Sequence, residues 1–207
     1  MRLQEASDAD DRSILRRSSV WRVPLFLAAF SAAAALGGAT AQQQLRYDRT
    51  GIAGGELWRL LTGHFAHLGV AHLVLNLAGL GVVWMLVGGA YSSLGWVFVV
   101  ASSLALIDLG FWFLDRDLGW YVGMSGLLHA LLAAGIVSRF RVAKVESLAL
   151  VVVIAGKIAW EQLAGPLPGS ELSAGGPVVV NAHLYGAIAG LLAGGLLHTA
   201  SLRRVSI

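Results

Sequence analysis

The chain has 207 residues, of which 57% are hydrophobic and 13% are charged, and it contains no cysteine. This composition is too apolar for a water-soluble domain of that length, so the bilayer is the expected solvent. Without cysteine there is no disulfide, no thiolate nucleophile and no cysteine-ligated metal. The net charge is +3, but the basic residues do not form a stripe interleaved with aromatic residues, so no nucleic-acid partner is predicted.

Six apolar runs of about the length that crosses a hydrocarbon core follow one another along the chain. They predict an all-α membrane protein with six transmembrane helices. Residues 21–200 would form one domain between a polar cytoplasmic tail, 1–20, and a short basic cytoplasmic tail, 201–207. The expected spans are 21–41, 67–88, 93–114, 124–137, 145–163 and 179–198.

Basic residues gather before the first span, between the fourth and fifth spans, and after the sixth span. They are Arg12, Arg16, Arg17, Arg22, Arg139, Arg141, Lys144, Arg203 and Arg204. Because positive side chains near span ends stay on the cytoplasmic side, an even number of spans places these clusters and both termini in the cytoplasm.

The first run has a second interpretation, because the stretch GGATAQ at 37–42 offers an A-x-A cleavage site after Ala41. A cleaved signal peptide has this form. The run is as long as a spanning helix and longer than the usual signal core, however, which favours a retained span.

The second run begins in GHFAHLGVAHLVLN, which contains His64, His67, His72 and Asn76. Ionisable side chains at membrane depth are costly and indicate function. His72 and Asn76 are four residues apart, so they share a helix face and can both direct N–H donors toward a developing oxyanion. The stretch lacks an H-E-x-x-H pattern, so no metal is predicted, and His64 and His67 are expected to form hydrogen bonds at the interface.

The stretch YVGMSGLLHALLAAG at 121–135 places Ser125 at the start of a short helix. About 14 residues rise roughly 21 Å, less than a hydrocarbon core of roughly 30 Å, so the serine is expected in a sunken, wet pocket. Gly123 and Gly126 permit tight turns, and a helix N-terminus offers N–H groups to an oxyanion. A packing patch of small residues has the same pattern.

Two histidines are candidates for the base that activates Ser125. His183 shares a helix face with Gly186 and Gly190, so the sixth span can press closely against the alanine-rich fourth span. His129 lies one turn after the serine on the same face. Spacing does not choose between the two, and because no aspartate is placed to complete a triad, we expect a Ser-His dyad.

The third and fifth spans also carry charged residues. Lys157 and Glu161 are four residues apart on the fifth span, and an ion pair between helices is favoured there over a substrate-binding role. Asp108, in the third span, is expected to be a hydrogen-bonded interior residue.

Four motifs in order resemble those of the rhomboid intramembrane serine proteases: Trp58-Arg59, His72-x-x-x-Asn76, Gly123-Met124-Ser125-Gly126 and Ala182-His183-x-x-Gly186. The resemblance covers about 57–194 and implies a six-helix, rhomboid-like bundle. It implies Ser125 as nucleophile and His183 as base, without cofactor or metal. By the same resemblance, His72, Asn76 and the Ser125 N–H would form the oxyanion hole, supported by Gly123, Gly126 and His129.

Rhomboids usually carry tyrosine four residues after the serine, whereas this chain has His129, which would orient or stack on His183. This departure, with LRYDR at 45–49, ELWRLLTGHFAHL at 56–68, AWEQLAGP at 159–166 and GGPVVVNAHLYG at 175–186, is similar to the rhombosortase branch. That branch implies an enzyme of the bacterial inner membrane that opens to the periplasm. Its substrates would be membrane-anchored, exported proteins with a C-terminal tail of a Gly-Gly motif, a hydrophobic helix and a basic end.

Several alternatives remain open at this level. The acyl group can pass to water or to a small amine. The chain can instead be a general rhomboid protease of single-span proteins, or a non-catalytic rhomboid-like binding protein, although such proteins usually lack the serine or the histidine. A transporter is disfavoured because the polar residues cluster at one depth instead of lining a path.

Overall fold

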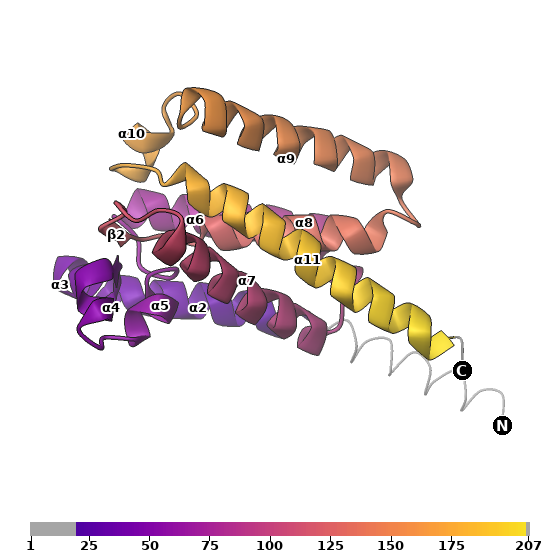
Figure 1. Cartoon of the computed structure of the whole chain (residues 1–207), viewed down its shortest axis with the longest axis horizontal. Helices are drawn as coiled ribbons and strands as arrows, with labels where there is room; N and C mark the ends of the chain where they lie inside the picture. Colours follow the sequence, from indigo (N-terminus) through magenta and orange to yellow (C-terminus); the bar gives the residue numbers. More distant parts are fainter. Residues whose placement is uncertain (1–19, 206–207) are drawn as a thin grey trace.

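The computed structural model describes residues 20–205, which form a bundle of helices with a two-stranded ribbon at one end (Figure 1). Of the two predicted tails, residues 1–19 and 206–207 lie outside the described residues. In chain order the elements are α2 (Arg22–Leu36), α3 (Gly38–Leu45), β1 (Tyr47–Asp48), α4 (Arg49–Ala53), α5 (Trp58–Thr62), α6 (Val70–Val87), η1 (Gly88–Ala90), α7 (Ser93–Phe113), β2 (Trp120–Tyr121), α8 (Ser125–Arg139), α9 (Lys144–Ala164), α10 (Ser170–Ala174) and α11 (Val180–Val205).

Four of these helices, α6, α7, α9 and α11, contain segments long and apolar enough to cross a membrane. The predicted fourth span is α8, whose 15 residues confirm the expectation of a short apolar helix. If the bent pair α2 and α3 counts as one span, the described residues contain five candidates. The chain is therefore a mostly helical, multi-pass membrane protein, while the count of six and the cytoplasmic termini stay predictions.

The expectation of one continuous helix over 21–41 is wrong. The helix α2 ends at Leu36, α3 begins at Gly38, and the two are bent by 119°. Gly38 has a φ of +61°, in the left-handed region that glycine adopts without steric cost. The sequence of α3, GATAQQQL, is also largely polar. The mean hydropathy of residues 21–41 shows neither feature. It averages the polar residues of α3 with the apolar residues of α2, and it contains no information on the backbone conformation at Gly37 and Gly38.

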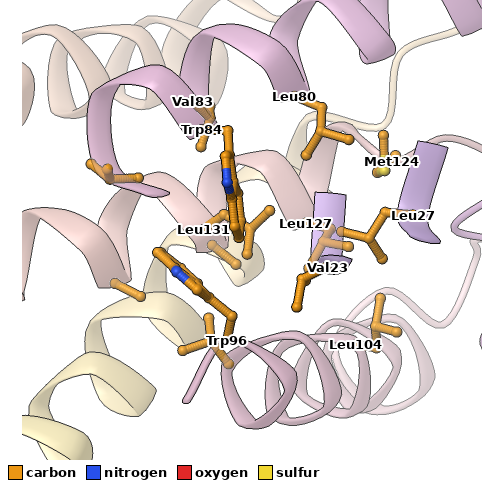
Figure 2. Close-up of a cluster of buried hydrophobic side chains, with 14 of the residues drawn as sticks. Val23, Leu27, Leu80, Val83, Trp84, Trp96, Leu104, Met124, Leu127 and Leu131 are labelled. Carbon is orange, nitrogen blue, oxygen red and sulfur yellow. The ribbon is translucent and has the colours of Figure 1, made fainter. Parts of the chain in front are cut away.

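The core of the bundle is an apolar cluster built around two tryptophans (Figure 2). The rings of Trp84 on α6 and Trp96 on α7 lie 5.0 Å apart between centroids. Leu127 and Leu131 of α8 are completely buried in the same cluster. The short helix α8 is therefore enclosed by its neighbours, which holds its first residue in a fixed place.

The helix α2 contributes side chains to this core. Val23 and Leu27 are buried members of the cluster (Figure 2). Helices inside a membrane associate largely through close van der Waals packing of this kind. The helix α2 is thus part of the packed bundle.

The helices α8 and α11 form the most extensive helix pair of the bundle. At Gly186 of α11 an added Cβ would lie 2.0 Å from the carbonyl oxygen of Gly126, and at Gly190 it would lie 2.1 Å from that of Ala130. No side chain fits in that space. The predicted small-residue face of the sixth span is thus confirmed, and it sets the short distance between the helices that carry the candidate serine and histidine.

A cluster of short elements gathers at the end of the bundle where α8 begins (Figure 1). There β1 pairs antiparallel with β2, with Tyr47 opposite Tyr121. Arg49 donates hydrogen bonds to carbonyl oxygens at the end of α7, including Phe111 at 2.6 Å and Asp115 at 2.9 Å. These donors supply partners to carbonyl oxygens at the helix C-terminus, where intrahelical donors run out. They also anchor the ribbon whose second strand leads into Ser125.

Three helix ends that carry a basic residue lie at the opposite end of the bundle (Figure 1). There α2 begins at Arg22, α8 ends at Arg139 and α9 begins at Lys144. A shared end for these positions is what the predicted cytoplasmic arrangement requires.

Candidate active site

Ser125 is the first residue of α8, and the turn before it depends on glycine. Gly123 has a φ of +124°, and an added Cβ would lie 2.9 Å from the His72 ring. The Tyr121 hydroxyl donates a hydrogen bond of 2.5 Å to the Gly123 carbonyl. Burial raises the pKa of Tyr121, so its hydroxyl stays a neutral donor. Conformation, space and a buried hydrogen bond therefore all fix the chain just before the serine.

His183 faces the serine from α11. Its Nε2 atom lies 2.9 Å from the Ser125 Oγ, within hydrogen-bond distance. The competing His129 points its Nδ1 atom at the Ser125 backbone carbonyl, 2.7 Å away. His183 is thus the histidine whose ring nitrogen meets the hydroxyl, while His129 donates to the main chain of its own helix.

The other ring nitrogen of His183 meets a carboxylate from α9. The Glu161 Oε2 atom lies 2.8 Å from His183 Nδ1, and its Oε1 atom lies 2.6 Å from Lys157 Nζ. The predicted Lys157–Glu161 ion pair is therefore confirmed. The contact with His183 was not predicted, because the i,i+4 spacing already gave Glu161 a partner in Lys157. The signal in the sequence is a carboxylate within an apolar span, which indicates function.

His72 and Asn76 lie beside the serine, on α6. The His72 Nδ1 atom accepts a hydrogen bond of 3.4 Å from the Leu68 backbone N–H, so a neutral ring carries its proton on Nε2. The Asn76 Nδ2 atom donates to the His72 carbonyl at 3.0 Å, which leaves its second N–H free of that bond. His72 and Asn76 thus each have an N–H group that can donate a hydrogen bond to a substrate oxygen beside Ser125.

These groups share one cavity of about 220 Å³. Its polar wall contains His72, Asn76, Ser125, His129, Glu161 and His183. The remaining walls of the cavity are mostly apolar. They include Leu75 of α6, Leu128 of α8 and residues in the segment 167–179, between α9 and α11. A nucleophile, a base and several donors therefore converge on a space large enough for a few peptide atoms.

A family profile of the Rhomboid domain matches residues 54–200, which is more than half of the chain. The chain belongs to the rhomboid family. Members of this family are intramembrane serine proteases. The matched region contains every candidate site residue of this rhomboid, from His72 to His183. A search of curated proteins found no match to the chain.

In this rhomboid the ring of His129 lies flat against the ring of His183. The ring centroids are 4.3 Å apart and the planes differ by 20°. The stacking implied by the resemblance is therefore present. Because the His129 Nδ1–H is bonded to the Ser125 carbonyl, the stacking ring is itself held in place.

His64 and His67, which precede the His72-x-x-x-Asn76 motif, are buried and hydrogen-bonded, so the expected hydrogen bonds are confirmed, while their place at the membrane interface stays a prediction. His64 is completely buried and pairs with Asp108 at 3.2 Å, which confirms Asp108 as an interior hydrogen-bonded residue. His67 bonds the Phe65 carbonyl at 2.9 Å. Burial, with a smaller contribution from His72, lowers the pKa of His67 to about 4, so its ring is neutral near pH 7.

Within residues 20–205, one group of side chains has the spacing to hold a metal ion. The ligand atoms of His129, Glu161 and His183 lie within 4.8 Å of one another. Both nitrogens of His183 and both oxygens of Glu161 already have partners, and the Lys157 ammonium supplies the positive charge. The arrangement therefore fits a chain of hydrogen bonds better than a metal centre.

Proposed function

We propose that this rhomboid is an intramembrane serine endopeptidase in which Ser125 is the nucleophile and His183 is the general base. The observation that carries the proposal is the 2.9 Å contact between Ser125 Oγ and His183 Nε2 on the wall of a mixed polar and apolar cavity. A serine hydroxyl is too weakly acidic to attack a peptide unaided, and an adjacent imidazole is the usual means of activation.

The chemical steps follow from the positions of these atoms. His183 Nε2 takes the proton of Ser125 Oγ as that oxygen attacks the peptide carbonyl, and the carbonyl electrons move onto its oxygen. Donors from His72, Asn76 and the Ser125 backbone N–H stabilise this oxyanion. The C–N bond then breaks, the amine leaves with the proton from His183, and an acyl-enzyme remains on Ser125.

Release of the acyl group completes the cycle. Water attacks the ester while His183 again accepts a proton, which regenerates the serine and yields a carboxylic acid. A small amine attacking in place of water yields an amide. Both acceptors use the same base and the same oxyanion donors.

We infer that the substrates are membrane-anchored proteins with a C-terminal tail of the Gly-Gly type, as in rhombosortases. A cavity of about 220 Å³ suits small side chains at the cleavage point. A substrate helix must unwind to present a peptide bond, and each glycine lowers that cost by about 1 kcal/mol relative to alanine. The basic residues at the far end of the bundle support a site that opens to the periplasm of a bacterial inner membrane.

Cleavage of two matched tails in proteoliposomes tests this substrate class. One single-span protein carries Gly-Gly before its hydrophobic helix, and the other carries Leu-Leu at the same positions. The wild type is expected to cleave the Gly-Gly tail at least about tenfold faster than the Leu-Leu tail. Leucine stabilises the helical form of the tail, which does not expose a peptide bond, and its side chain is too large for the cavity. Ser125→Ala should cleave neither, and mass spectrometry with an added amine identifies the acceptor.

Other outcomes would separate the alternatives. Equal cleavage of both tails would contradict the Gly-Gly preference and favour a general rhomboid protease. Binding of the tail by the wild type without any product, under conditions that preserve the fold, would favour a non-catalytic binding protein.

A further inference from the structure

We propose that Glu161 completes a Ser125–His183–Glu161 triad, in which it is a positioning residue that acts through His183. This inference rests on the proposed function, because it assigns a role within the same reaction. It departs from the dyad expected from the sequence. The partners, burial and charge of the three groups support it.

Glu161 is buried and fully engaged. It is 3% exposed and His183 is 4% exposed, so neither group exchanges partners freely with water. Each carboxylate oxygen has one short contact, Oε2 with His183 Nδ1 at 2.8 Å and Oε1 with Lys157 Nζ at 2.6 Å. A buried carboxylate is costly unless it is paired and hydrogen-bonded, and both conditions hold here.

The contact with Glu161 selects the tautomer of His183. An ionised carboxylate only accepts hydrogen bonds, so the Nδ1 atom that faces it must carry the proton. In the neutral ring Nε2 is then bare and accepts the proton of the Ser125 hydroxyl, 2.9 Å away. When that proton arrives, the carboxylate stabilises the imidazolium that forms.

Lys157 pairs with the carboxylate of Glu161 and does not compete for His183. Its Nζ atom lies 3.2 Å from His183 Nδ1, but two donors cannot bond to each other. The productive partner of the lysine is therefore Glu161, whose carboxylate accepts hydrogen bonds from both Lys157 and His183. Within the described residues, the ionisable groups packed against His183 are Lys157 and Glu161 from α9 and His129 from α8.

The ring of His183 is thus fixed in two directions. Glu161 holds its edge, and His129 covers one of its faces at 4.3 Å. Glu161 is also one of the few buried residues of α9, with Ser147 and Ile154. The place of α9 in the bundle therefore determines the orientation of the base.

The test uses a fluorophosphonate probe, which reports proton removal from Ser125 and needs no identified substrate. Glu161→Gln in the full-length protein is expected to lower the maximal rate of phosphonylation roughly 10²- to 10⁴-fold, because the amide permits the wrong tautomer. The probe concentration at half-maximal rate should stay within about threefold. Glu161→Asp should recover part of the rate, since it restores an acceptor-only group.

Matched variants separate this role from a structural one. Glu146→Gln changes an exposed glutamate on the same helix and should react like the wild type. If Glu161→Gln is unstable in thermal melting, Lys157→Met/Glu161→Gln removes both members of the ion pair together and is measured in its place. A rate within about threefold of wild type in a folded Glu161 variant, or no recovery in Glu161→Asp, would overturn the triad. Failure of the wild type itself to react would instead contradict the proposed function.

Discussion

Replacing His183 with alanine is expected to lower the rate of peptide cleavage roughly 10³- to 10⁶-fold, with little change in stability. The imidazole is the group at 2.9 Å from the Ser125 hydroxyl, so without it the proton has no acceptor in reach. Its removal also leaves the Glu161 carboxylate paired with Lys157, which limits the cost of the lost contact. Single-turnover cleavage of a reconstituted substrate, with thermal melting as a check of the fold, measures this effect.

His129→Ala is the matched comparison, because it removes the other imidazole of the site. We expect a loss of about tenfold, since this ring supports His183 by stacking and donates to a backbone carbonyl, but does not meet the hydroxyl. A larger loss in His129→Ala than in His183→Ala would exchange the two roles and contradict the assignment of the base.

The substitution Gly186→Ala is expected to lower the rate of cleavage strongly, although Gly186 is not a residue of the site. The added Cβ would lie 2.0 Å from the Gly126 carbonyl oxygen, so α8 and α11 must separate by roughly 1 Å to restore an ordinary contact. A displacement of that size between reacting groups costs about 10²-fold in rate. Gly186→Ala should therefore lower cleavage by at least about 10²-fold and also lower the midpoint of thermal unfolding.

Gly195→Ala provides the control for this prediction on the same helix. Nothing lies within 4 Å of a Cβ at Gly195, so the change adds a methyl group to open space. Alanine is the better helix former by about 1 kcal/mol, and we expect unchanged cleavage and equal or higher stability. If both variants lost cleavage activity equally, the close approach of α8 and α11 would not determine the geometry of the active site.

Those parts of the fold that depend on local pattern could be predicted from the sequence. The small residues at Gly186 and Gly190 indicated a close approach to the fourth span, and the structure has it. The shortness of α8 followed from the distance between Gly123 and Arg139. In each case the information lies within one helical segment, where periodicity determines which residues share a face.

The features that were missed depend on conformation or on neighbours distant in sequence. The break at Gly37 and Gly38 is a choice of backbone angles that an apolar average does not register. The contact of Glu161 with His183 depends on how α9 is rotated against α11, and its i,i+4 spacing to Lys157 is equally compatible with a simple ion pair. Tertiary packing decides between the two, and the structure contains both contacts.

Activation of Ser125 is tested most directly by peptide mapping after the purified, reconstituted protein reacts with a fluorophosphonate. We expect the phosphonyl group on Ser125 in the wild type, no modification in Ser125→Ala, and severely slowed modification in His183→Ala. A folded wild type that does not react in several lipids, or that reacts equally without Ser125, would contradict a serine protease mechanism for this chain.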